Sequence, residues 1–157
     1  MFEDLTIIAD ADKPTIIMKR KFAAPPAVVF EAWTKPEHVA QWWDPSGVPL
    51  AVCEIDLRPD GAYRWIHQGA DGAHPPFTGT YLEIAPTRLL KFTVQSPPPD
   101  APSVGTLVFR EDDGQTTFSL TIECASVEQR DALLKMRVDV GTAHTLENLA
   151  NYLNKIA

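Results

Sequence analysis

A long stretch of two-residue alternation between residues 48 and 124 most constrains what this chain can fold into. Apolar and polar side chains alternate there in six segments, the pattern of strands with one buried face. The segments are residues 48–57, 62–68, 77–84, 88–95, 105–112 and 116–124. Turn-forming residues separate them, as at Asp71-Gly72 and Asp113-Gly114. Because the connections are short, the sequence predicts consecutive antiparallel hairpins.

A further strand and two short helices are predicted before this region. Residues 15–22 form the strand pattern, and Pro25 and Pro26 follow it. Proline suits the first turn of a helix, where the backbone N–H groups lack intrahelical partners. The segment Thr34-Lys35-Pro36-Glu37 has the capping-box pattern and predicts the start of a second helix, which ends at Asp44-Pro45-Ser46-Gly47.

The last 30 residues predict one long helix. Ser126 and Gln129 have capping-box spacing, and no proline follows up to Lys155. A continuous helix of about 28 residues would span roughly 42 Å, enough to cross a whole sheet. Gly141 costs such a helix about 1 kcal/mol relative to alanine. It indicates a kink, a close approach to a sheet or ligand, or a glycine that is merely tolerated.

A wide sheet and one amphipathic helix must bury each other's apolar faces, and a sheet of this width curls. We therefore expect an α+β fold in which a curved antiparallel sheet of about six to seven strands grips the C-terminal helix. Strand parity places these residues inward: Tyr63, Trp65, His67, Phe77, Gly79, Tyr81, Glu83, Leu90, Phe92, Val94, Leu107, Phe109, Phe118, Leu120 and Ile122. Their polar-tipped aromatic rings indicate either a ligand cavity or a filled core whose polar tips bond one another.

Composition limits the partners. The 157 residues suit one domain, and a net charge of -7 disfavours binding to nucleic acid or to an anionic membrane. No apolar run approaches the roughly 20 residues of a membrane span, and the N-terminus lacks a signal-peptide pattern. Cys53 and Cys124 have no metal-ligand spacing. We expect no metal, no other cofactor and a cytoplasmic location.

Few residues suggest catalysis. His67 is either a general base or, as we favour, a hydrogen-bonded histidine of the interior or rim. Glu83 either reaches a cavity mouth or, as we favour, pairs with a basic residue. Of Trp42 and Trp43, one is expected to roof the cavity and the other to anchor the short helix. No nucleophile elbow, phosphate loop or Cys–His pair is recognisable, so no catalytic residue is assigned.

Several short motifs occur in order along nearly the whole chain. They include Phe22-x-Ala24-x-Pro26, Trp42-Trp43, Asp56-x-Arg58-Pro59-x-Gly61-x-Tyr63, Gly79-x-Tyr81-x-Glu83, Ser126-x-x-x-Arg130-Asp131 and Gly141-x-x-x-x-Leu146. The ordered set resembles the prokaryotic family similar to the activator of the heat-shock protein 90 ATPase, within the START-like, polyketide-cyclase-like (SRPBCC) superfamily. This resemblance implies a single START-like domain over residues 1–157 with a helix-grip fold. The sequence departs from the family pattern at Asp60, where a glycine is usual, and at Asp44 and Val138.

Three functions are weighed. The aromatic-lined grip favours binding of a hydrophobic small molecule, lipid-like or polyketide-like. His67 and Tyr81 motivate a cyclase-like or hydrolase-like enzyme, and the resemblance alone motivates a stress-response module that contacts a chaperone ATPase. A homodimer is also left open. The expected ligand-binding residues are Trp42, Tyr63, Trp65, His67, Phe77, Tyr81, Phe92, Phe109, Phe118, Val138 and Gly141.

Overall fold

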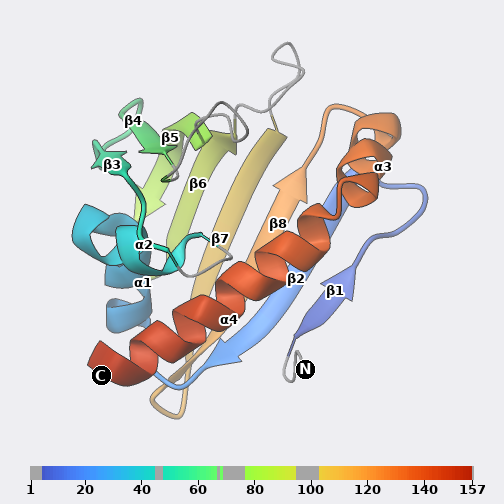
Figure 1. Cartoon of the computed structure of the whole chain (residues 1–157). Helices are drawn as coiled ribbons and strands as arrows, with labels where there is room; N and C mark the ends of the chain where they lie inside the picture. The colour runs from blue at the N-terminus through green and yellow to red at the C-terminus, as the bar shows by residue number, and fades with distance from the viewer. Residues whose placement is uncertain (1–4, 45–47, 67, 69–76, 95–102, 157) are drawn as a thin grey trace.

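The computed structural model of the chain describes residues 5–44, 48–66, 68, 77–94 and 103–156. Within these ranges it contains eight strands and four helices (Figure 1). The strands are β1 (Thr6–Ile8), β2 (Thr15–Phe22), β3 (Val52–Ile55), β4 (Ala62–Ile66), β5 (Phe77–Ala85), β6 (Leu89–Val94), β7 (Ser103–Asp112) and β8 (Gln115–Glu123). The helices are α1 (Pro26–Thr34), α2 (Pro36–Trp42), α3 (Val127–Lys135) and α4 (Val138–Ile156).

The described strands form one antiparallel sheet in the order β1-β2-β8-β7-β6-β5-β4-β3. Strands β3 to β8 are neighbours in chain order, so the predicted run of hairpins is confirmed. The sheet has one strand more than the upper limit of the prediction, because β1 pairs with β2 at the edge. Thr6 and Ile7 of β1 are exposed, so no buried alternation marks this short strand in the sequence.

Helix α4 runs diagonally across one face of the curved sheet, and α1 and α2 lie together near one end of it (Figure 1). The predicted α+β helix-grip arrangement is confirmed. The buried side chains of α4 recur every three or four residues, at Ala143, Leu146, Leu149 and Leu153. They join the core with inward side chains of the sheet, such as Met18 of β2.

The prediction of one continuous C-terminal helix is wrong, because α3 and α4 are separated at Met136 and Arg137. Arg137 has a φ of 60°, in the left-handed region that ends an α-helix. Its backbone N–H donates to the carbonyl of Leu134 at 3.0 Å. The predicted start is confirmed, since the Ser126 hydroxyl accepts from the Gln129 N–H at 3.1 Å.

The capping box predicted at Thr34 is also wrong. Thr34 is the last residue of α1, and its hydroxyl donates to the Phe30 carbonyl at 2.9 Å. Lys35 precedes α2 in extended conformation and makes no side-chain cap. Pro26 and Pro36 each lie in a first helical turn, so the prediction of a proline at a helix start is confirmed for both, whereas Pro25 is the N-cap residue of α1.

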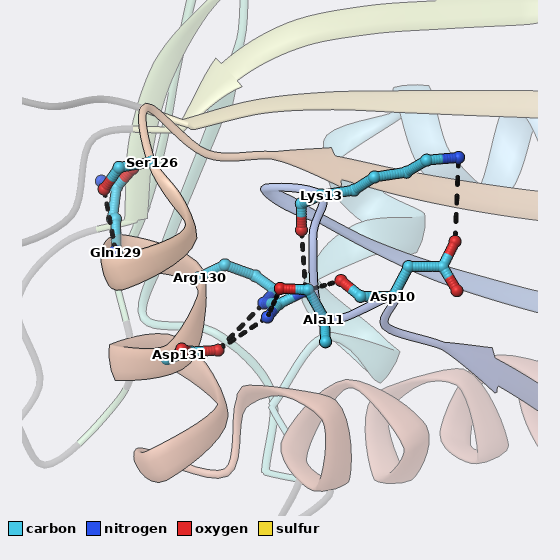
Figure 2. Close-up of polar contacts among 7 residues, drawn as sticks. All are labelled: Asp10, Ala11, Lys13, Ser126, Gln129, Arg130 and Asp131. Atoms are coloured by element: carbon cyan, nitrogen blue, oxygen red, sulfur yellow. Dashed lines mark hydrogen bonds and ion pairs between the residues drawn. The ribbon is translucent and has the colours of Figure 1, made fainter.

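Arg130 ties α3 to the segment between β1 and β2 (Figure 2). This residue is only 4% exposed. Its guanidinium donates to the backbone carbonyls of Asp10, Lys13 (2.7 Å) and Ala11 (3.5 Å), and to the Asp131 carboxylate at 2.8 Å. One buried cation therefore fixes a turn that has little apolar packing of its own.

The inward placement of Glu83 is wrong because β5 contains a bulge. Its pairing with β6 shifts register between Tyr81 and Glu83. Leu82 and Glu83 are both exposed as a result, while Ile84 packs against the core. Glu83 lies opposite Lys91 in the ladder. Most other inward predictions are confirmed by burial: Tyr63, Trp65, Gly79, Tyr81, Leu90, Phe92, Leu107, Phe109, Phe118 and Leu120.

Candidate functional site

A cavity of about 320 Å³ lies between the inner face of the sheet and the helices. Small-molecule sites typically measure ~300–1,000 Å³, so this one has room for a small ligand. Strands β4 to β8 supply one wall and α3 and α4 supply the other, while Trp33 of α1 and Trp43 at the end of α2 complete the lining. The lining residues are Trp33, Trp43, Tyr63, Trp65, Phe77, Tyr81, Leu90, Phe92, Val94, Ser103, Gly105, Leu120, Ile122, Leu133, Val138, Gly141, Thr142, Thr145 and Leu146.

Aromatic rings form a continuous part of the sheet wall. The Tyr63 ring centroid lies 5.1 Å from that of Trp65 and 5.5 Å from that of Tyr81. The Trp43 ring lies 4.6 Å from Trp65 and 4.8 Å from Phe77. Strand alternation places the β4 and β5 rings of this wall on one face of the sheet, and Trp43 joins them from the end of α2.

The phenol of Tyr63 is anchored by a hydrogen bond. Its hydroxyl donates to the Thr93 carbonyl at 2.7 Å. A Cβ at Gly79 would lie 1.9 Å from that carbonyl oxygen and 2.7 Å from the Tyr63 hydroxyl. Only glycine leaves room for this bond, so Gly79 determines where the Tyr63 ring stands in the cavity wall.

The α4 wall is built from smaller side chains. Val138, Gly141, Thr142 and Thr145 line the cavity along it. A Cβ added at Gly141 would meet no described atom within 4 Å outside the neighbouring part of its own helix. The sequence alternative of a close packing contact at Gly141 is therefore wrong. The glycine faces open space in the cavity wall, which is compatible with approach by a ligand.

The two adjacent tryptophans have different positions. Trp43 lines the cavity, whereas Trp42 is 1% exposed and donates its indole N–H to the Ala32 carbonyl at 3.1 Å. Trp42 thus anchors α2 to α1. The Thr145 hydroxyl of α4 donates to the Trp43 carbonyl at 3.2 Å and holds the backbone that carries the Trp43 ring.

Seven of the eleven residues expected to bind a ligand line this cavity: Tyr63, Trp65, Phe77, Tyr81, Phe92, Val138 and Gly141. Trp42, Phe109 and Phe118 do not, and this corrects their placement in the cavity. Phe109 and Phe118 pack on each other with ring centroids 5.6 Å apart, in the part of the core beside α1. His67 lies outside the described residues.

Sequence reasoning missed several lining residues. Ser103 and Gly105 share strand parity with Leu107, so alternation places them inward although neither is apolar. The glycine makes room for Phe92, whose ring would lie 2.7 Å from a Cβ at position 105. Trp33 packs on Phe118 in a stacked arrangement and also reaches the cavity.

The described part of the cavity wall offers no strong acid or base. The described residues that line it include no Asp, Glu, Lys, Arg or His. Burial raises the pKa of the Tyr63 and Tyr81 phenols far above the usual value, so both stay protonated at neutral pH. Burial and the nearby Glu37 charge raise the pKa of the Cys53 thiol to about 11. Cys53 is therefore a poor nucleophile.

The described residues offer neither a metal cluster nor a membrane-spanning helix. They contain no group of three His, Cys, Asp or Glu side chains that could hold a metal ion. They also contain no helix that is long and apolar enough to cross a membrane.

The sequence profile of one protein family matches residues 23–154, and the family is described as "Activator of Hsp90 ATPase homolog 1-like protein". The match spans all the lining residues and every helix except the end of α4. No curated protein is significantly similar to the chain.

Solved structures resemble the chain along nearly its full length. A protein from Rhodobacter sphaeroides has 22% identity and a TM-score of 0.86, covering 98% of this chain and 99% of its own. A protein from Nitrosomonas europaea has 22% identity and a TM-score of 0.81, covering 94% and 97%. A protein from Mycobacterium smegmatis has 23% identity and a TM-score of 0.81, covering 98% and 99%. At such identity these likenesses establish the fold alone.

Proposed function

The chain belongs to the family of activator of Hsp90 ATPase homolog 1-like proteins. From this premise we propose that it is a cytoplasmic START-like domain, and that it binds a hydrophobic small molecule in the cavity between the sheet and α4. One observation carries the proposal. The mid-molecule cavity of about 320 Å³ is lined almost entirely by apolar and aromatic side chains. Burial of a ligand's apolar surface there yields about 25 cal/mol per Å².

Gly141 supports a cavity that is open for an occupant. Glycine in a helix costs about 0.5–1 kcal/mol relative to alanine. No described neighbour outside the helix lies within 4 Å of a Cβ at this position, so close packing does not explain the glycine. The consequence of glycine at this position is free volume on the α4 wall.

Binding has more support than catalysis or a chaperone contact. General acid–base catalysis needs a group that titrates near the working pH. The described cavity lining offers only phenols whose pKa is raised, and hydroxyl groups of Ser and Thr. A chaperone contact is supported by the family description alone.

The test is to fill the cavity from the α4 side. N-phenyl-1-naphthylamine is a neutral dye whose fluorescence rises in an apolar site, and we expect it to bind the wild-type protein. Gly141→Leu adds a side chain where the structure has open space, so dye affinity should fall by about tenfold or more. Gly141→Ala should retain most of the binding.

Val140→Leu is the matched control, because Val140 is 37% exposed and does not line the cavity. It should bind the dye as the wild type does. The proposal is overturned if the wild type retains no dye, or if a folded Gly141→Leu variant binds as tightly as the wild type. Circular dichroism establishes that each variant is folded.

A further inference from the structure

On the premise of the proposed function, we infer that the occupant is a neutral aromatic molecule with an oxygen that accepts a hydrogen bond from Tyr81. This names the chemical class of the ligand and distinguishes it from long-chain lipids and from organic acids. Three properties of the described cavity wall support it: it contains no charged side chain, aromatic rings line it, and it contains hydrogen-bond donors without a partner.

The lack of charge argues for a neutral ligand. Moving an ion into an apolar site without a partner costs several kcal/mol. Arg20, whose buried side chain lies on the β2 face that contacts α4, does not line the cavity. Its guanidinium donates to the Glu147 carboxylate at 2.7 Å. This buried cation therefore lies outside the cavity wall and is already paired, so it offers no counter-charge to an anionic ligand in the cavity.

The ring-lined wall argues for a flat aromatic ligand. The Trp65 and Phe77 rings are stacked at 5.5 Å, and Tyr63 contacts both of them. Aromatic side chains have few rotatable bonds, so they form rigid flat surfaces. Each favourable ring–ring contact adds about 0.5–1.5 kcal/mol beyond the area it buries. A flexible alkyl chain would gain no such term and would lose conformational freedom.

The unpaired donors argue for an acceptor oxygen. Tyr81 is 2% exposed and lines the cavity, and its hydroxyl makes no hydrogen bond with any residue that the structure describes. Tyr63 is different, because its hydroxyl is bonded to Thr93. The buried indole N–H groups of Trp33 and Trp65 also find no acceptor in the described part of the chain. An indole N–H can only donate.

An unmade hydrogen bond at a buried donor costs about 1–3 kcal/mol. The Trp33 and Trp65 indoles carry this cost, whereas the Tyr81 hydroxyl is not among the fully buried unpaired atoms. A carbonyl or ether oxygen on the ligand would accept from the Tyr81 hydroxyl in place of water. The ligand therefore combines an aromatic body with a neutral acceptor.

The experiment compares four probes by isothermal titration calorimetry. They are 2-acetylnaphthalene, its acceptor-free counterpart 2-ethylnaphthalene, the anion 2-naphthoate and the alkyl alcohol 1-decanol. We expect 2-acetylnaphthalene to bind about fivefold more tightly than 2-ethylnaphthalene. It should bind at least about tenfold more tightly than 2-naphthoate or 1-decanol.

Tyr81→Phe removes only the hydroxyl and should abolish the preference for the acetyl over the ethyl compound. Tyr152→Phe is the matched control and should keep that preference, because Tyr152 does not line the cavity and its hydroxyl bonds His38. Urea unfolding of both variants separates a change of affinity from a loss of folded protein.

Each arm has its own contrary result. Equal binding of the acetyl and ethyl compounds, or a preference that survives Tyr81→Phe, overturns the acceptor. Equal binding of 2-naphthoate overturns neutrality, and tighter binding of 1-decanol overturns the aromatic class. In these three cases the cavity still binds a hydrophobic molecule, so the proposed function stands. If no probe and no dye binds, the proposed function itself fails.

Discussion

Arg130 shows how much of this fold depends on a single polar side chain. It is almost fully buried, yet three of the groups that its guanidinium contacts are backbone carbonyls of the β1–β2 connection. Asp131, which neutralises its charge, lies next to it in the sequence. The hydrogen bonds of this arginine therefore hold α3 against the β1–β2 connection at the edge of the sheet.

We expect Arg130→Met to destabilise the protein by about 2–4 kcal/mol, because several buried carbonyls lose their donor. Urea unfolding followed by circular dichroism measures the change. Lys13→Ala is the control, since its exposed ion pair with Asp10 should be worth less than about 0.5 kcal/mol and its carbonyl remains. Similar unfolding midpoints for the two variants would contradict the role given to Arg130.

Residue positions were predictable from the sequence where strand parity was regular. Tyr63, Trp65 and Tyr81 are inward for that reason. Parity failed at Glu83, because a bulge depends on how two strands pair and leaves no mark in one strand's own pattern. The sequence could not show which of Trp42 and Trp43 lines the cavity, because this depends on how α2 packs against α1. The Trp42 indole N–H donates to the Ala32 carbonyl of α1, which leaves Trp43 to line the cavity.

At the scale of elements, the break between α3 and α4 decides how the cavity is closed. The break lets α3 contribute Leu133 and α4 contribute Val138 to the same wall. Arg137 carries the left-handed backbone at the break, where glycine is the usual residue. The sequence pattern showed an uninterrupted helix because arginine is a good helix former.

We expect Arg137→Gly to stabilise the protein by about 0.5–1 kcal/mol, because glycine adopts a positive φ without steric cost. Ala132→Gly, at an exposed position inside α3, should destabilise it by about 1 kcal/mol. Thermal unfolding of both variants tests the opposite signs. A loss of stability in Arg137→Gly equal to that in Ala132→Gly would show that the break is not held by this residue's conformation.

For the molecule as a whole, the sequence predicted which layers form but not whether they leave a cavity between them. Apolar alternation and helical periodicity require a sheet face and a helix face to meet, and this much follows from burial alone. Whether they leave a cavity depends on side-chain volumes at positions such as Gly105 and Gly141, summed over several elements. No single segment contains that sum, so a filled core and a cavity were equally compatible with the sequence.

Neutral thiol and phenol groups that pack in or against the core also make the stability of the fold sensitive to alkaline pH. The pKa of Cys53 is raised to about 11 by burial, and those of Tyr63 and Tyr81 are raised further for the same main reason. In the unfolded chain a thiol titrates near pH 8.5 and a phenol near pH 10. Between about pH 9 and 11 the unfolded state therefore releases protons that the folded state retains, and stability falls as pH rises.

We expect the urea midpoint to be constant from about pH 7 to 8 with respect to these groups and to decrease between about pH 9 and 11. Cys53→Ser removes one titrating group, so its midpoint should decrease less steeply from about pH 9 onward than that of the wild type. Tyr63→Phe should match the wild-type slope between about pH 9 and 10 and flatten only above it, where phenols of the unfolded chain ionise. A wild-type midpoint that stays level or rises through this range would show that water reaches these groups in the folded protein and that the cavity wall does not exclude charge.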